Sequence, residues 1–153
     1  KIMEKIYFLQ LQSVSFKKFK SFLDSLDEER KTWSLDLQNF KNEKEFYDKM
    51  TNCILAMSKD KITGLACMYV DSKYKLAEFS FVVKKEYHSM GIGTKMLAFL
   101  ETQLREQGFN DYTLTAKHFK NNIASMVVFN KLGWNIDIQN GQWDFLFRSK
   151  KLN

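Results

Sequence analysis

Proline is absent from this chain, and cysteine and histidine each occur only twice among its 153 residues. Two cysteines cannot build a disulfide framework, and we expect Cys53 and Cys67 to be reduced, buried thiols. His88 and His118 have no cysteine or carboxylate at ligand spacing, so the sequence carries no signature of a metal site. The absence of proline says little about function.

Long hydrophobic runs are also missing, since no apolar stretch approaches the roughly 20 residues of a membrane span. The first residues lack the basic, apolar and small-residue plan of a signal peptide. We therefore expect a cytoplasmic protein without a membrane partner. With 153 residues and 44% hydrophobic content, the chain is long enough for a sizeable core, and we expect one domain over residues 1–153.

Positive charge predominates, because the chain has 24 lysines and arginines but only 18 aspartates and glutamates, which gives a net charge of +6. A basic chain favours polyanionic partners such as a phosphorylated cofactor or a nucleic acid. The lysines are spread along the chain, however, and no nucleic-acid-binding motif is present. We expect no nucleic-acid partner, and a solvated lysine-rich surface explains the charge equally well.

The apolar periodicity predicts the element order β-α-α-β-β-β-α-β-α-β-β. The expected strands cover residues 7–11, 53–58, 62–70, 74–83, 111–116, 134–139 and 143–147, with a hairpin turn at Asn140–Gly141. The expected helices cover residues 16–26, a segment capped by Asn42, residues 92–107 before Gly108, and residues 122–132 before Gly133. The helix over residues 92–107 has an apolar stripe, formed by Ile92, Met96, Leu97, Leu100 and Leu104. Glu101 and Arg105 form an i,i+4 pair on the same helix.

The most informative segment runs from the buried strand that ends at Val83 to the helix that begins near Ile92. Between them lies a polar turn with two glycines one residue apart, Gly91 and Gly93. Such a turn exposes backbone N–H groups at the positive end of a helix dipole, which predicts an anion site. A Walker loop and a dinucleotide-binding fingerprint both fail, because the further glycines that they require are missing.

Two segments carry a family resemblance. The first, His88-Ser89-Met90-Gly91-Ile92-Gly93, is similar to the Arg/Gln-x-x-Gly-x-Gly/Ala signature of the GNAT N-acetyltransferase family. The second runs from Asn122 through Phe129 to Gly133-Trp134, and resembles the Asn-x-x-Ala-x-x-x-Tyr-x-x-x-Gly-Phe segment of that family. The resemblance covers roughly residues 55–134. It implies an α/β (α+β) GNAT fold, with a mixed central sheet of about six to seven strands and about four helices.

The resemblance also implies acetyl-CoA as the cofactor. Backbone groups of the strand near Val82 and Val83 would pair with the pantetheine arm, and N–H groups from Ser89 to Thr94 would hold the pyrophosphate. Asn122 would cap its helix and bond to the pantetheine. The implied cofactor-binding residues are Phe81, Val82, Val83, His88, Ser89, Met90, Gly91, Ile92, Gly93, Thr94, Asn122 and Phe129.

Glu78 is the candidate catalytic base. It shares one face of its strand with Leu76, Ser80 and Val82, where apolar neighbours would desolvate the carboxylate. A base is needed because an amine with a pKa near ~10 is mostly protonated at neutral pH. The family's usual acid, a tyrosine, is replaced here by Phe129, which has no hydroxyl.

The function implied by the resemblance is transfer of an acetyl group from acetyl-CoA to a primary amine of a small molecule or peptide, by direct attack. Neither cysteine lies in a motif typical of a covalent nucleophile. The alternative is a non-catalytic or weakly active acyl-CoA-binding domain, which the loss of the tyrosine favours. The sequence leaves a monomer and a homodimer equally open.

Overall fold

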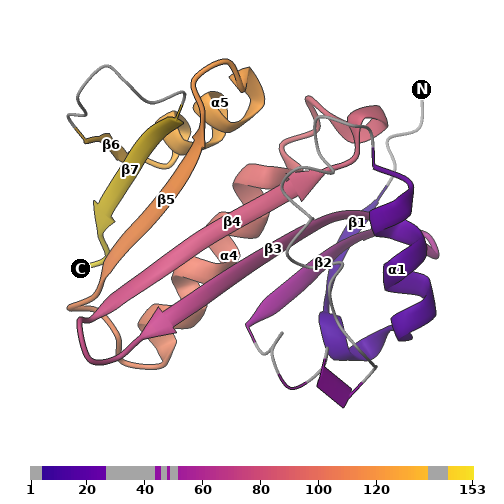
Figure 1. Ribbon diagram of the computed structural model, residues 1–153, viewed down its shortest axis with the longest axis horizontal. Helices are drawn as coiled ribbons and strands as arrows, with labels where there is room; N and C mark the ends of the chain where they lie inside the picture. The colour runs from indigo at the N-terminus through magenta and orange to yellow at the C-terminus, as the bar shows by residue number, and fades with distance from the viewer. Residues whose placement is uncertain (1–4, 27–43, 46–47, 49–51, 138–144) are drawn as a thin grey trace. The chain divides into compact units, whose positions relative to one another are not determined.

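The computed structural model of the protein describes residues 5–26, 44–45, 48, 52–137 and 145–153. Seven strands of these residues form one mixed sheet in the order β1-β2-β3-β4-β5-β7-β6 (Figure 1). The strands are β1 Ile6–Gln10, β2 Cys53–Ser58, β3 Lys61–Asp71, β4 Leu76–Val83, β5 Thr113–Phe119, β6 Asn135–Ile136 and β7 Phe145–Lys151. The helices are α1 Phe16–Asp24, α4 Ile92–Glu106 and α5 Ile123–Lys131, with short 3-10 turns η1 Leu11–Ser13 and η3 Lys85–Tyr87.

The internal contacts of the chain group it into two units. The N-terminal unit consists of residues 1–67 and 82–92, and the C-terminal unit of residues 68–81 and 93–153. Two strands, β3 and β4, and the helix α4 contribute residues to both units.

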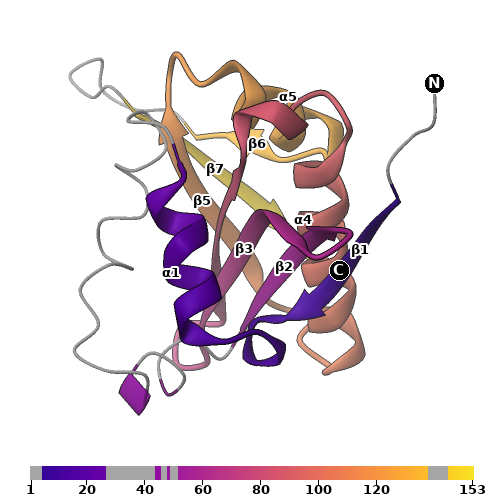
Figure 2. The ribbon, with the colours of Figure 1, turned by 90° about the vertical axis from the view of Figure 1, so that its right-hand side faces the viewer.

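In the N-terminal unit, β1, β2 and the first part of β3 form an antiparallel meander. The tight turn between β2 and β3 places Lys59 at a φ of 53°. Helix α1 packs against these strands, and Figure 2 shows it lying along β2 and β3. Ser15 begins α1 by accepting a hydrogen bond of 3.1 Å from the backbone N–H of Lys18, the usual way to satisfy a free N–H in the first turn. The buried apolar side chains of this unit include Leu11, Phe19, Leu23, Leu55, Leu65 and Val82.

In the C-terminal unit, β4 and β5 run parallel, whereas β7 pairs antiparallel with both β5 and β6. Strand β7 therefore lies between two strands that precede it in the chain. The predicted stripe of α4 is buried: Met96, Leu97, Leu100 and Leu104 all have no exposed surface.

The predicted mixed sheet is confirmed, with boundary differences toward the C-terminus. Strand β5 runs to Phe119, three residues beyond its predicted end, and β7 runs to Lys151, four residues beyond its predicted end. The two strands support each other over this length, because all seven residues of β5 pair with β7. Three α-helices are described where about four were predicted. The helix expected after Asn42 and the turn at Asn140–Gly141 lie mostly or wholly outside the described residues.

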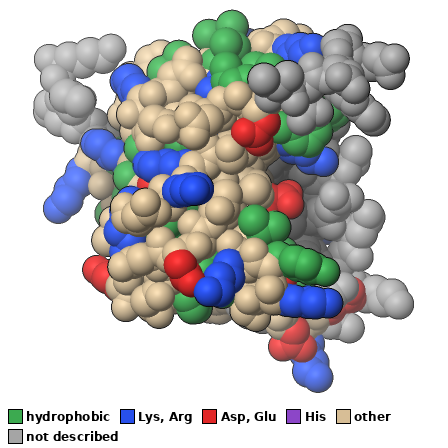
Figure 3. Space-filling view, turned by 90° about the vertical axis from the view of Figure 1, so that its left-hand side faces the viewer, with side chains coloured by type: hydrophobic (Ala, Val, Ile, Leu, Met, Phe, Trp, Pro, Cys, Tyr) green, Lys and Arg blue, Asp and Glu red, His purple; other side chains and the backbone are tan. Residues whose placement is uncertain are grey.

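None of the described helices is long and apolar enough to cross a membrane. On the face drawn in Figure 3, lysine and arginine side chains lie scattered among carboxylates.

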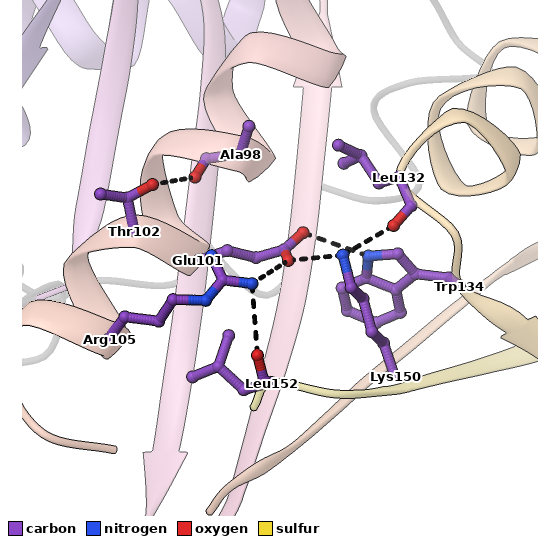
Figure 4. A network of polar contacts seen from close by, with 8 residues as sticks. All are labelled: Ala98, Glu101, Thr102, Arg105, Leu132, Trp134, Lys150 and Leu152. Carbon is purple, nitrogen blue, oxygen red and sulfur yellow. Dashed lines mark hydrogen bonds and ion pairs between the residues drawn. The ribbon is translucent and has the colours of Figure 1, made fainter. Parts of the chain in front are cut away.

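A buried carboxylate connects α4, β7 and the loop between α5 and β6 in the C-terminal unit (Figure 4). The side chain of Glu101, on α4, is 3% exposed and contacts the Lys150 ammonium of β7 at 2.7 Å. The predicted Glu101–Arg105 pair is confirmed at 3.5 Å, and the indole N–H of Trp134 donates to the second carboxylate oxygen at 3.4 Å. Lys150 also donates to the carbonyl of Leu132 at 2.6 Å. Since a buried carboxylate is costly unless it is paired and hydrogen-bonded, these contacts specify how α4 and β7 pack together.

Glu101→Gln should lower the free energy of unfolding by about 2–3 kcal/mol, because it removes the charge that compensates Lys150 in a mostly buried position. Urea denaturation monitored by circular dichroism measures the loss. Arg105→Gln is the matched control, since the Arg105 side chain is 40% exposed and should contribute less than about 1 kcal/mol. Equal losses in the two variants would contradict this account.

Candidate active site

Parallel pairing between β4 and β5 is confined to one end of the two strands. Leu76–Glu78 of β4 pair with Thr113–Thr115 of β5, and within the C-terminal unit the strands then diverge (Figure 1). Glu78 is thus the last residue of β4 that pairs with β5. Beyond it, the backbone groups of residues 79–81 on the β5 side have no β5 partner, and an extended ligand with amide groups can pair with such an edge.

The chain leaves β4 through η3 and enters α4 through a short loop. Ser89 has a φ of 68° and Gly91 a φ of 76°, and both residues are exposed. In the part of the chain that is described, no backbone acceptor lies within bonding distance of the N–H groups of residues 89–91. The first-turn N–H groups of α4, from Ile92 onward, lack partners within the helix and add a positive dipole. The predicted anion site therefore has the local backbone geometry that it needs.

Gly91, in the loop, and Gly93, in the first turn of α4, have different structural roles. Gly91 adopts a backbone conformation that residues other than glycine rarely adopt. Space is not the reason for this glycine, because a Cβ there would have no atom within 4 Å. Gly93 lies inside α4 and is needed for packing. A Cβ at Gly93 would lie 2.8 Å from the Phe81 ring and 3.1 Å from a Val128 methyl group. The two-glycine pattern predicts that both glycines serve the anion site, whereas in the structure Gly93 lets α4 approach β4 and α5.

His88 is held by the strand that precedes the loop. Its Nε2 lies 3.0 Å from the carbonyl oxygen of Val83, within the N-terminal unit. This contact occupies one backbone group near the end of β4, where the family resemblance predicts pairing with pantetheine. His88 therefore braces the entry of the loop, because a ring N–H at Nε2 can donate to the Val83 carbonyl oxygen.

Phe129 is buried in a cluster of rings. Its ring centroid lies 5.9 Å from that of Phe81 on β4, 5.0 Å from that of Trp134, and 5.5 Å from the His118 imidazole on β5, which it stacks almost parallel. The side chain is only 2% exposed. The structure thus brings together Phe81, Gly93 and Phe129, three of the predicted cofactor-binding residues.

Asn122 caps α5 as predicted. Its Oδ1 accepts a hydrogen bond of 3.0 Å from the N–H of Ser125. The amide Nδ2 takes no part in this bond, so the cap leaves a donor for the second role that the resemblance implies.

Glu78 has different surroundings from those predicted. Leu76 and Glu78 are exposed and alternate with the buried Ala77 and Phe79, so the predicted period of two is confirmed for this half of β4. The expected apolar enclosure of Glu78 is wrong, because the carboxylate lies on the solvent side of the strand. Among the described residues, Glu78 makes no ion pair.

A buried arginine lies next to Phe129, and sequence reasoning missed it. Arg148 of β7 is 1% exposed. Its Nε donates to Nε2 of His118 at 3.1 Å, its Nη1 donates to Oδ1 of Asn130 at 2.8 Å, and its guanidinium carbon lies 5.9 Å from the Phe129 ring centroid. Nη2 is buried without a partner among the described residues. Arg148 lies opposite the buried Ala116 of β5, so the β5–β7 pairing places its side chain on the buried face of the sheet. The sequence does not reveal which strands pair, and the burial of Arg148 could therefore not be predicted.

The contacts of His118 define its protonation. Because an arginine only donates, Nε2 of His118 must accept, and Nδ1 therefore carries the hydrogen that it shares with the carbonyl of Phe119 at 2.8 Å. Burial lowers the pKa of His118 below its ordinary value, and the nearby Arg148 charge lowers it further, although the Phe119 carbonyl opposes both. Burial also lowers the pKa of Arg148.

Gly93→Ala should destabilise the protein by about 1–2 kcal/mol, because overpacking against Phe81 and Val128 outweighs the higher helix propensity of alanine. Phe81→Leu removes the ring atom nearest to the added methyl group. The double variant should therefore be more stable than the sum of the two single changes by at least about 0.5 kcal/mol in a double-mutant cycle. Strict additivity would contradict the close approach.

His118 should make stability fall with acid. Its pKa is lower in the folded than in the unfolded state, so below about pH 6.5 the unfolded chain binds a proton that the folded chain does not. Stability is thus full above the unfolded pKa and decreases as the pH falls toward the folded pKa. Melting temperatures between about pH 8 and 5 should decline less in His118→Gln than in the wild type; parallel profiles would show that His118 does not contribute.

The chain was compared with protein-family models, curated proteins and solved structures. The chain matches the family model described as the acetyltransferase (GNAT) family over residues 14–134. No curated protein matches it.

Solved structures share the fold at low sequence identity. A Pyrococcus horikoshii protein, PH1933, superposes with a TM-score of 0.72 at 22% identity, covering 97% of this chain and 99% of its own. The PaiA N-acetyltransferase of Thermoplasma acidophilum, solved in complex with coenzyme A, gives 0.68 at 14% identity, with 96% and 99% covered. The ribosomal-protein-S18-alanine N-acetyltransferase of Escherichia coli gives 0.62 at 16% identity, with 96% and 92% covered. Together with the β4–loop–α4 geometry, the match over residues 14–134 shows that this chain belongs to the GNAT acetyltransferase family.

Proposed function

We propose that the protein transfers an acetyl group from acetyl-CoA to a primary amine of a small molecule or peptide. The loop from Ser89 to Thr94 carries this proposal. Its positive φ values at Ser89 and Gly91, its exposed backbone and the start of α4 suit a pyrophosphate. Family membership and the coenzyme A complex of the T. acidophilum relative support the same ligand.

The proposed cofactor contacts come from the backbone of the chain. N–H groups of residues 89–94 hold the pyrophosphate, and the backbone of Phe81, Val82 and Val83 pairs with the pantetheine amides. His88 braces the loop through its contact with Val83. Asn122 offers its Nδ2 donor to the same arm. We also propose that residues 1–153 work as a single domain, since β3, β4 and α4 each belong to both units.

Acetyl-CoA, when bound, supplies a thioester carbonyl that an amine can attack. Glu78 removes a proton from the ammonium of the acceptor, directly or through water, so that the nitrogen lone pair becomes available. Its exposure gives a water or an amine free access to the carboxylate. The new C–N bond would form as the C–S bond breaks; the sulfur would keep the bonding electron pair as a thiolate, and the attacking nitrogen would release its second proton to water.

Phe129 cannot protonate that thiolate. A thiol with a pKa near ~8.5 leaves tolerably without an acid, and water can supply the proton afterwards. The same residue supports a second candidate function, a non-catalytic or weakly active acyl-CoA-binding domain. This alternative is favoured by the burial of Phe129 among Phe81, His118 and Trp134, which makes it a packing residue.

Titration calorimetry with acetyl-CoA tests the proposed ligand, and thiol release with a panel of polyamines, amino sugars and amino-terminal peptides tests the transfer. We expect micromolar binding and turnover with at least one amine. Binding without turnover across the panel would favour the second candidate function. Absence of any heat with acetyl-CoA would contradict both.

Glu78→Gln should reduce turnover by about 10²-fold or more while it leaves the affinity for acetyl-CoA nearly unchanged, because the general base acts in the chemical step. Glu106→Gln, an exposed carboxylate at the end of α4, is the matched control and should retain full turnover. Unchanged turnover in Glu78→Gln would remove this residue as the base.

A further inference from the structure

Two thiols meet in the N-terminal unit, outside the candidate active site. Cys53 begins β2, and Cys67 lies directly opposite it in the antiparallel β2–β3 ladder. Their sulfur atoms are 2.8 Å apart, and both residues are free cysteines. Cys53 is buried as predicted, whereas the predicted burial of Cys67 is wrong, because this residue is only partly buried. Their adjacency could not be inferred from the sequence because it depends on the strand register.

The backbone already has the spacing that a disulfide requires. Facing residues of an antiparallel pair have Cα atoms about 4.5 or 5.5 Å apart, and both values lie within the roughly 4.4–6.8 Å range of disulfides. The sulfurs would need to approach by less than about 1 Å to reach a bond length near 2.05 Å. No rearrangement of β2 or β3 is therefore needed to join them.

We propose that Cys53 and Cys67 form an oxidisable dithiol, which a peroxide converts to a reversible intrachain disulfide. The inference rests on strand register and sulfur geometry and is independent of the proposed function.

The exposure of the two residues sets the order of events. Cys53 is 3% exposed, whereas Cys67 is partly exposed and meets the oxidant first. Burial raises the pKa of the Cys67 thiol, and so does the neighbouring Cys53. Because thiolate is therefore scarce, the reaction should be slow, and the limited access favours a small oxidant.

The reaction balances in two displacements. The Cys67 sulfur attacks one oxygen of hydrogen peroxide, the O–O bond breaks, and a sulfenic acid and water result after the thiol proton has been transferred. The Cys53 sulfur then attacks the Cys67 sulfur, the S–O bond breaks, and the thiol proton leaves with the hydroxyl as a second water. Two thiols and one peroxide thus give one disulfide and two waters.

The disulfide would join β2 and β3 at the point where the chain enters β2. It would close the segment from Cys53 to Cys67, which contains the turn at Lys59 and the register shift between Ala56 and Met57. Cross-linking this segment restricts the unfolded chain more than the folded one, so the oxidised protein should resist unfolding better.

Hydrogen peroxide treatment of the full chain, followed by alkylation under denaturing conditions and proteolytic mass mapping, tests the proposal. We expect both thiols to disappear together, a linked peptide pair containing Cys53 and Cys67, and full recovery of the thiols with dithiothreitol. The protein should stay monomeric in weight on a non-reducing denaturing gel, and its melting temperature should rise.

Cys67→Ser and Cys53→Ser serve as matched controls, and each should form a stable sulfenic or sulfinic acid or remain unmodified, without a linked peptide. The wild-type mapping does not depend on how well these variants fold. Oxidation of the wild type to sulfinic acid without a linked pair would overturn the proposal. So would a disulfide between two chains.

Discussion

Gly93 lies where α4 packs against β4, and its missing side chain leaves room for the ring of Phe81 and a methyl group of Val128. The position of the loop depends on this approach, because a helix held further from the strand would direct its first N–H groups elsewhere. Gly91 then completes the turn with a φ of 76°. One glycine fixes packing and the other fixes backbone conformation, and the proposed pyrophosphate site needs both.

Two buried charged side chains of the C-terminal unit, Glu101 and Arg148, differ in whether a partner of opposite charge neutralises them. Glu101 is neutralised by Lys150 and accepts from Trp134, so that its burial strengthens the connection between α4 and β7. Arg148 has neutral partners only, His118 and Asn130, and keeps one buried nitrogen without an acceptor among the described residues. A guanidinium tolerates such a position better than an ammonium, because it is more weakly hydrated. Arg148 lies against Phe129, which stands where the family usually has a tyrosine.

Much of the fold follows from local patterns. The stripe of α4, the cap of α5 by Asn122 and the alternation around Glu78 are each set by residues within one element, and each is found as predicted. The predictions that failed involve partners from elsewhere in the chain. Glu78 is exposed rather than enclosed, and β5 is longer because β7 pairs with its whole length.

The glycine-rich turn, the helix that follows it and the family resemblance can be read from the sequence, because dihedral freedom and helix periodicity are properties of a few adjacent residues. Three further features emerge only when the chain is folded: Gly93 serves packing, Arg148 and His118 lie against Phe129, and Cys53 faces Cys67. Each of these depends on which strands are neighbours and in which register, and a register is fixed by burial summed over whole elements.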